Sequence, residues 1–283
     1  MPSVGIVTCM DLPEPDPDER PLLDALRAKG LDARMLAWDD HSLSPSAFDV
    51  CVVRSTWNYH EDPAQFTHWL READTKTRLF NPLPVLRWNI HKRYLREMES
   101  AGLPIVPTRF LDRGAPADLS AVMRGEGWSD VVVKPAISAG SANTRRFTED
   151  QLDEGSCFLN ALVTQRDMMV QPYLKTIEEG GERALVWIDG EATHCVEKSP
   201  RFADDDESVS GALAIADDEH AMLRRALGII DNDPLYARLD VIRDDDNALR
   251  ISEFELLEPS LFLVQHPPAM DRLVTAIARL AEL

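Results

Sequence analysis

The chain has 283 residues, and 44% of them are hydrophobic, which is enough apolar material for two or three cores. Its 49 acidic residues outnumber 30 lysines and arginines, so the net charge of −19 argues against nucleic acid as a partner. No apolar run is long enough for a membrane span, and the N-terminus lacks a basic region for secretion. Four scattered cysteines suit reduced thiols, and we expect a cytoplasmic protein.

Predicted strands and helices alternate over the first 84 residues. The expected elements, three strands and two helices, lie at residues 4–9, 18–29, 32–38, 49–54 and after Pro63. Such alternation is typical of a small parallel α/β layer. The sequence Asn81-Pro-Leu-Pro84 marks its boundary.

After residue 84 the sequence pattern predicts helices and β-hairpins. Asp189-Gly190 is a strong two-residue hairpin signal between alternating segments. The expected elements are helices at 88–101, 217–228 and 267–282 and hairpin strands at 182–188 and 193–198. Short strands mixed with helices indicate an α+β organisation after residue 84.

An acidic hairpin is the most informative feature of the sequence. Residues 235–243 alternate apolar and polar side chains and run into the turn-prone Asp244-Asp-Asp-Asn247. A hairpin about this turn puts Asp240 opposite Glu253, with Glu255 two residues further along the same face. Three neighbouring carboxylates repel one another, and hard oxygen ligands suit Mg²⁺. The pattern therefore indicates a Mg²⁺ site or, alternatively, a solvated acidic face.

A second candidate site follows an apolar strand that ends in Lys134. The small residues after it include Ser138, Gly140 and Ser141. Small side chains let backbone N–H groups approach a phosphate, while the lysine supplies charge. The spacing of a Walker A loop is absent, and the alternative is an ordinary turn at the end of a strand.

Two further segments offer polar groups near predicted strand ends. Gln171 can bind an amide or a base edge, and Pro172 fixes the chain as at a hinge, although a plain strand end is the alternative. Lys198 and Arg201 are cations in an acidic region and would face an anion, unless they pair with the acidic residues at 204–206.

The first layer also ends a strand in polar residues. Arg54, Ser55, Thr56 and Tyr59 follow an apolar run, at the strand end where open α/β sheets collect ligands. Arg54 could hold a carboxylate through two hydrogen bonds, and the alternative is a surface arginine that pairs locally.

In this order, three motifs resemble the ATP-grasp superfamily, specifically its glutathione-synthetase-like branch. They are Val132-Val-Lys-Pro135, Val170-Gln-Pro-Tyr-Leu174 and the pair Ala237-Arg-Leu-Asp240 with Glu253-Phe-Glu255. The resemblance covers nearly the whole chain. It implies an ATP-grasp fold with an N-terminal α/β domain (1–84), a central and lid region (85–172) and a C-terminal α+β subdomain with the metal site (173–283), the last two holding ATP between their sheets.

The resemblance also implies roles by position. The residues expected to bind ATP are Lys92 and Lys134 (phosphates), Ser138, Gly140 and Ser141 (covering loop), Gln171, Tyr173 and Leu174 (adenine) and Glu182 (ribose). The expected Mg²⁺ ligands are Asp240, Glu253 and Glu255. The expected catalytic cations are Lys198, Arg201 and Arg238, and the expected substrate-binding residues are Arg54, Ser55, Thr56, Tyr59 and Ser260.

Two positions depart from glutathione synthetases. Ala184 stands where the bacterial enzymes have arginine, which argues against glutathione as product, and the covering loop has one glycine where they have several.

The function implied is that of an ATP- and Mg²⁺-dependent carboxylate–amine ligase working through an acyl phosphate on a small amino-acid-like substrate. Residues 53–57 and 255–262 are similar to antibiotic-forming cyclo-ligases that close O-ureido-D-serine into D-cycloserine. One alternative is a ligase of secondary metabolism that joins a separate amine into a dipeptide or amide. The other is a nucleotide-binding protein without catalysis. A homodimer is compatible with the resemblance.

Overall fold

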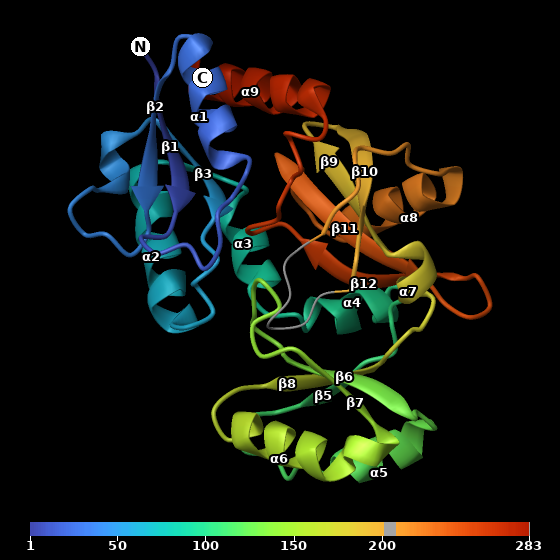
Figure 1. The fold of residues 1–283 in the computed structure, drawn as a ribbon. Coiled ribbons are helices and arrows are strands. Elements are labelled where there is room, and N and C mark those ends of the chain that lie inside the picture. The colour runs from blue at the N-terminus through green and yellow to red at the C-terminus, as the bar shows by residue number, and fades with distance from the viewer. Residues whose placement is uncertain (201–207, 283) are drawn as a thin grey trace.

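The computed structural model describes residues 1–200 and 208–282. In these residues the strands form three four-stranded sheets, which we call the N-terminal, central and C-terminal sheets (Figure 1). The N-terminal sheet (order β2-β1-β3-β4) is parallel, and the central (β5-β8-β6-β7) and C-terminal (β10-β9-β11-β12) sheets are antiparallel. The expected change from a parallel α/β layer to antiparallel α+β layers is confirmed. The exact domain boundaries stay a prediction.

The N-terminal sheet follows the predicted alternation closely. Its elements are β1 (Ser3–Thr8), α1 (Glu19–Ala28), β2 (Asp32–Ala37), η1 (Pro45–Ala47), β3 (Val50–Ser55), α2 (Pro63–Lys76) and β4 (Arg78–Phe80). Strand β3 is buried along its whole length, as expected for a parallel strand covered on both faces. The short edge strand β4 was not predicted, because three residues are too few to show a period.

The central sheet lies with its two long helices below the rest of the molecule in Figure 1. Its elements are β5 (Arg109–Leu111), α5 (Leu119–Glu126), β6 (Asp130–Pro135), β7 (Arg145–Thr148), η2 (Glu149–Gln151), α6 (Leu152–Val163) and β8 (Met168–Pro172). Asp118 caps the start of α5, and Gly127 ends it with a φ of +72°. Helices α5 and α6 bury Leu119 and Leu159 against Phe147 in a core built from this region alone.

The C-terminal sheet contains both predicted hairpins. Its elements are α7 (Ile177–Gly180), β9 (Glu182–Ile188), β10 (Glu191–Lys198), α8 (Asp217–Leu227), β11 (Tyr236–Arg243), β12 (Leu249–Glu255) and α9 (Pro267–Glu282). Asp189 and Gly190 have φ values of +45° and +88°, as the tight turn between β9 and β10 requires. Both expected hairpins are therefore confirmed.

The helix expected over residues 88–101 is wrong as a single element. The structure has α3 (Leu83–Asn89) and α4 (Tyr94–Ser100), separated by a turn that carries Lys92. The Asn89 side chain donates to the carbonyl of Phe254 and accepts from the amide of Leu256, both at 2.7 Å. The Lys92 amide donates to the Ala136 carbonyl at 2.8 Å. These long-range bonds replace helical ones, so the apolar pattern alone could not reveal the break.

The N-terminal and C-terminal sheets share one apolar core. Val4 and Ile6 of β1 belong to the same buried cluster as Val186 of β9 and Leu273 of α9. We call these two sheets with α1 and α9 the platform. Within the described residues, no helix combines the length and the apolar character that crossing a membrane requires.

Candidate functional site

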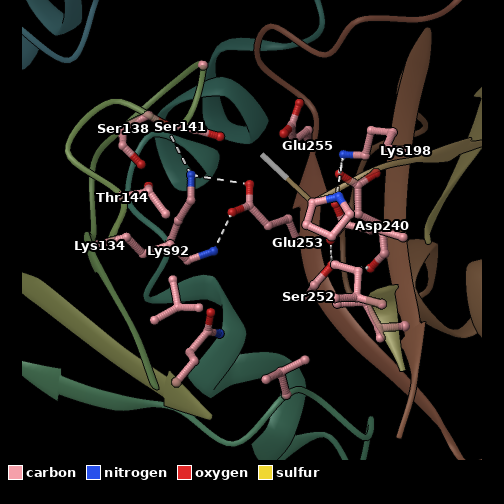
Figure 2. Close-up of a pocket in the computed structure, with 18 of the residues that line it drawn as sticks. Lys92, Lys134, Ser138, Ser141, Thr144, Lys198, Asp240, Ser252, Glu253 and Glu255 are labelled. Atoms are coloured by element: carbon pink, nitrogen blue, oxygen red, sulfur yellow. Dashed lines mark hydrogen bonds and ion pairs between the residues drawn. The ribbon is translucent and has the colours of Figure 1, made fainter. Parts of the chain in front are cut away.

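A cavity of about 220 Å³ lies between the central and C-terminal sheets. Figure 2 shows charged side chains that point into it from both sides. The residues that the sequence predicts to bind ATP all line it, namely Lys92, Lys134, Ser138, Gly140, Ser141, Gln171, Tyr173, Leu174 and Glu182. The predicted metal ligands, catalytic cations and substrate-binding residues that line it are Lys198, Arg238, Asp240, Glu253, Glu255 and Ser260.

The acidic hairpin has the predicted register. Asp240 of β11 lies opposite Glu253 of β12, and Arg238 lies opposite Glu255. Ser252 donates from its hydroxyl to the Asp240 carbonyl at 3.0 Å across the same strand pair. The three acids therefore share one face of the sheet, as the alternation required.

Asp240 is neutralised by two cations of the chain. Lys198 Nζ lies 2.6 Å from its carboxylate, and Arg238 donates to both carboxylate oxygens at 2.8 Å. Burial opposes its charge, but Arg238 and Lys198 hold the pKa of Asp240 below its usual range. Lys198 also contacts Glu182 at 2.9 Å. Burial and Arg238 oppose the lysine charge, yet Asp240 and Glu182 raise the pKa of Lys198, so it stays protonated.

Glu253 connects the two faces of the cavity. Lys134 of β6 approaches its carboxylate to 2.7 Å, and Lys92 approaches it to 3.4 Å (Figure 2). Burial opposes the glutamate charge, but these two lysines bring its pKa far below the usual value. Lys92 also donates to the Ser138 carbonyl at 3.1 Å, which ties the covering loop to the same cluster.

Glu255 is less well compensated than its neighbours. Its one ion-pair partner in the described residues is Arg238, at 2.7 Å, and this arginine is shared with Asp240. Burial and the nearby charges of Asp240 and Glu253 outweigh the arginine and raise the pKa of Glu255 to about 7. The acidic face therefore carries one group whose charge depends on what binds beside it.

Lysine and arginine side chains relieve the repulsion among the three acids. Within residues 1–200 and 208–282, no three His, Cys, Asp or Glu side chains are placed to hold a metal together. The premise that these acids would lack cationic partners in the folded chain is therefore corrected. Their role as Mg²⁺ ligands stays a prediction.

The covering loop and the hinge frame the opposite wall. Gly140 and Ser141 have φ values of +56° and +58°, so the loop turns sharply between β6 and β7. Gln171 at the end of β8 is buried and donates to the Thr108 hydroxyl at 2.9 Å. The Arg146 guanidinium stacks on the Tyr173 ring, with its central carbon 3.6 Å from the ring centroid. Thr108 and Arg146, which lie outside the cavity, therefore position the segment Gln171–Leu174.

Four of the five expected substrate-binding residues lie behind the wall. The side chains of Arg54, Ser55, Thr56 and Tyr59 are all buried, and only Ser260 of that set lines the cavity. Arg54 donates to the Pro259 carbonyl at 2.9 Å and packs over the Tyr236 ring. Its role in substrate binding stays a prediction.

The side chains of Ser55, Thr56 and Tyr59 are likewise enclosed by the protein and do not line the cavity. Ser55 donates to Glu19, and Tyr59 donates to the Ser138 carbonyl at 3.4 Å. The Thr56 hydroxyl has no hydrogen-bond partner among the described residues. Arg201, an expected catalytic cation, lies outside the described residues.

Sequence reasoning missed Trp57 and Glu258, both of which line the cavity. The Trp57 indole donates to the Glu258 carbonyl at 3.0 Å, which joins the N-terminal layer to the segment after β12. Glu258 is 8% exposed. Burial, reinforced by Glu255, raises its pKa to about 8 against the opposing effect of Lys92. Its position in an irregular segment gave no periodic signal that could have identified it.

This arrangement can hold a highly charged ligand. Lys92 and Lys134 project from one side of the cavity, and a face of carboxylates with its own cations lies opposite. Lysine ammonium groups attract phosphate oxygens, and carboxylates attract hard cations. The cavity can therefore attract anionic groups to its lysines and cationic groups to its carboxylates.

Comparison with known proteins gives consistent relatives. The family described as D-cycloserine synthetase DcsG, N-terminal domain, matches residues 4–81. Cycloserine biosynthesis protein DcsG of Streptomyces lavendulae is 30% identical over 287 residues, covering 93% of each chain. The crystal structure of D-cycloserine synthetase DcsG matches with 27% identity and a TM-score of 0.89 over 99% of both chains.

A more distant match is ATP-grasp ligase PsnB, solved in complex with a phosphomimetic variant of its minimal precursor, Mg and ADP. It is 16% identical, with a TM-score of 0.64 over 98% of this chain and 99% of that one. At this identity the likeness concerns the fold alone.

Proposed function

The chain belongs to the D-cycloserine synthetase family of ATP-grasp ligases, and on that premise we propose that it closes O-ureido-D-serine into D-cycloserine with ATP as phosphoryl donor. Family membership makes the chain an ATP-dependent ligase with acyl-phosphate chemistry, and the fold and enzyme class expected from the sequence are confirmed. The finer assignments below concern substrate, nucleotide, metal and residue roles.

One observation carries the proposal. The likeness to the cycloserine protein runs through both chains almost end to end, so it includes the N-terminal layer as well as the two sheets around the cavity. Trp57 and the segment Glu258–Ser260 bring that layer into the cavity wall. A cavity of about 220 Å³ lined by both acidic and basic side chains suits a small zwitterion.

We assign the nucleotide to the central side of the cavity. Lys92 and Lys134 would turn from Glu253 to the phosphates, because both ammonium groups already reach the middle of the cavity. The adenine would lie at Gln171, Tyr173 and Leu174, and the covering loop of Ser138, Gly140 and Ser141 would exclude water from the phosphates. Glu182 would accept from the ribose hydroxyls.

The donor set on the acidic face fits Mg²⁺. Asp240, Glu253 and Glu255 supply only carboxylate oxygens, the hard ligands that Mg²⁺ takes, and they share one face of β11 and β12. When bound, Mg²⁺ neutralises charge on the transferring phosphoryl group. Lys198 and Arg238 hold the acids in place and present positive charge to the same region.

The proposed reaction has two bond-forming steps. The substrate carboxylate attacks the γ-phosphorus of ATP, ADP leaves, and the resulting acyl phosphate has a good leaving group. The ureido nitrogen bonded to oxygen then attacks the same carbonyl carbon and loses its proton, phosphate leaves, and the five-membered ring closes. D-Cycloserine carries no carbamoyl group on that nitrogen, so hydrolytic loss of the carbamoyl group completes the conversion. Binding the substrate in a folded conformation favours the intramolecular attack.

The experiment is phosphate release from Mg·ATP across a panel of amino acids that includes O-ureido-D-serine and its L-form, with product masses recorded. We expect turnover with the D-ureido compound alone and a cyclic product. Turnover only when a second amine is supplied would replace the proposal with an intermolecular ligase. ATP binding with no turnover of any panel member would refute the catalytic proposal.

A further inference from the structure

Glu258 is a buried acid of the cavity wall for which the reaction described above has no role. It is 8% exposed, and among residues 1–200 and 208–282 no lysine, arginine or histidine nitrogen lies within ion-pairing distance of its carboxylate. The other acids of the same wall differ in this respect. Asp240, Glu253 and Glu255 each contact at least one cation of the chain.

An uncompensated carboxylate is costly at such a position. Removing an ionised carboxylate from water without a partner costs several kcal/mol, and a neutral hydroxyl does not supply the missing charge. The Tyr59 hydroxyl lowers the pKa of Glu258, but by less than burial and Glu255 raise it. The raised pKa of Glu258 reflects the same deficit, because burial and Glu255 disfavour its charge and Lys92 compensates only in part. A cation arriving with a ligand would remove this cost.

Glu258 lines the same cavity as Glu255, Arg238 and Ser260, which is what an α-amino acid requires of its two binding groups. In such a molecule the ammonium nitrogen and the carboxylate carbon are bonded to the same carbon atom, so their binding groups must be neighbours. Glu258 follows Glu255 by three residues, and Ser260, whose carbonyl accepts from Arg238 at 3.2 Å, follows it by two. Arg238 and Glu255 belong to the site proposed to activate the carboxylate. Glu258 lines the cavity together with them, and its backbone carbonyl accepts from Trp57 of the N-terminal layer.

We propose that Glu258 binds the α-ammonium group of the substrate and so selects α-amino acids over acids that lack the amino group. The inference rests on the proposed function, since it assumes that a small carboxylate is activated beside Glu255 and Arg238. Its ligand class is a zwitterionic α-amino acid. Charge pairing at a buried carboxylate gives the selectivity, because an analogue without the ammonium group would leave Glu258 uncompensated.

The test compares O-ureido-D-serine with 3-(ureidooxy)propanoate, the same molecule without the amino group. Wild type should prefer the amino acid in kcat/KM by roughly 10- to 100-fold, the range of one hydrogen bond between charged groups. In Glu258→Gln this preference should collapse to about 3-fold or less. The KM for ATP and the kinetics with the analogue should stay unchanged. Glu258→Asp, which keeps the charge, should restore part of the preference.

Three outcomes would overturn the inference. They are a preference that persists in Glu258→Gln, an equal loss with both compounds, which marks a structural role, and a wild type that does not discriminate between them. The last measurement uses the wild type alone, so the proposal can be refuted even if the Glu258→Gln protein folds poorly. Glu61→Gln, the same change at an exposed site, is the control for the substitution itself.

Failure of the proposed function gives a different result. If wild type ignores O-ureido-D-serine but turns over another α-amino acid of the panel, the substrate assignment falls. The selectivity ratio is then measured with that acid and its analogue lacking the amino group. If wild type acts on no α-amino acid at all, both proposals are refuted.

Discussion

The central sheet and the platform face the same cavity but are held in the molecule by different forces. The central sheet completes its own core with α5 and α6, through residues such as Leu119 and Phe147. The C-terminal sheet instead shares its core with the N-terminal sheet, where Val4 and Val186 belong to one cluster. The platform is thus stabilised by apolar burial between distant parts of the chain.

Contacts across the cavity are mainly ionic. Lys134 of the central sheet reaches Glu253 of the platform, whereas from the described strands β5 to β8 the apolar side chains in the core of the C-terminal sheet are Met169 and the partly buried Phe110. A phosphate or a metal ion can replace a partner in an ion pair, whereas a ligand cannot replace an apolar core. We therefore expect the acids of the platform to stay in place while the lysines opposite them exchange partners.

Asp240→Asn tests the platform most severely. The change leaves Lys198 and Arg238 buried beside a neutral amide, and breaking a buried pair costs about 3–5 kcal/mol. We expect the free energy of unfolding in urea to fall by that amount and ATP turnover to be lost. Asp218→Asn removes a more exposed ion pair with Arg243 and should cost less than about 1 kcal/mol. Equal losses in the two variants would contradict the comparison.

Lys134→Met tests the ionic contact instead. Glu253 keeps Lys92 as a partner, so the free energy of unfolding should change little. The Kd for ATP, measured by calorimetry, should rise roughly 10- to 100-fold, because one charged hydrogen bond to phosphate is lost. Arg145→Met, an exposed cation of β7 paired with Glu154, should leave the Kd unchanged. Unaltered nucleotide affinity in Lys134→Met would refute its assignment.

Arg54→Met tests whether the N-terminal layer positions the cavity wall at Glu258 and Ser260, where we propose that the substrate binds. Arg54 holds the Pro259 carbonyl, next to Glu258 and Ser260 in the wall. Loss of this bond should raise the KM for the amino acid by about tenfold and spare the KM for ATP. Arg78→Met, an exposed arginine on β4 of the same sheet, is the control. A change confined to ATP would disprove the role.

His194→Gln tests how the stability of the C-terminal sheet depends on pH, and its expected effect is the smallest of the four. His194 is buried on β10 and stacks on His266, and burial, aided by His266, lowers its pKa from 6.5 to about 4. The unfolded chain binds a proton near pH 6.5 and the folded chain only near pH 4, so stability falls as the pH drops through this window. Between pH 7 and 5, wild type should lose about 1–2 kcal/mol more than the variant in urea unfolding. Parallel pH dependence would exclude a buried neutral His194.

Local patterns were sufficient for the acidic hairpin. Alternation and the turn at Asp244–Asn247 placed Asp240 opposite Glu253, because strand period and turn chemistry depend on neighbouring residues. They were not sufficient at Lys92, where bonds from Asn89 to β12 break an apparently continuous helix. Arg54 was identified as polar at a strand end, but its burial behind Pro259 depends on a segment 205 residues away.

The sequence by itself determined the strand–helix alternation of the first layer, the two hairpins of the C-terminal sheet with the antiparallel pairing of the acids, and the family resemblance, since each depends on short spacings or on motifs in order. Only the tertiary structure decided which charge neutralises which. Lys134 and Glu253 are 119 positions apart, and nothing local joins them. It also decided that Glu258 is buried in the cavity wall with no ion-pair partner among residues 1–200 and 208–282. Burial and long-range electrostatics are properties of the packed chain, so no reading of neighbouring residues could supply them.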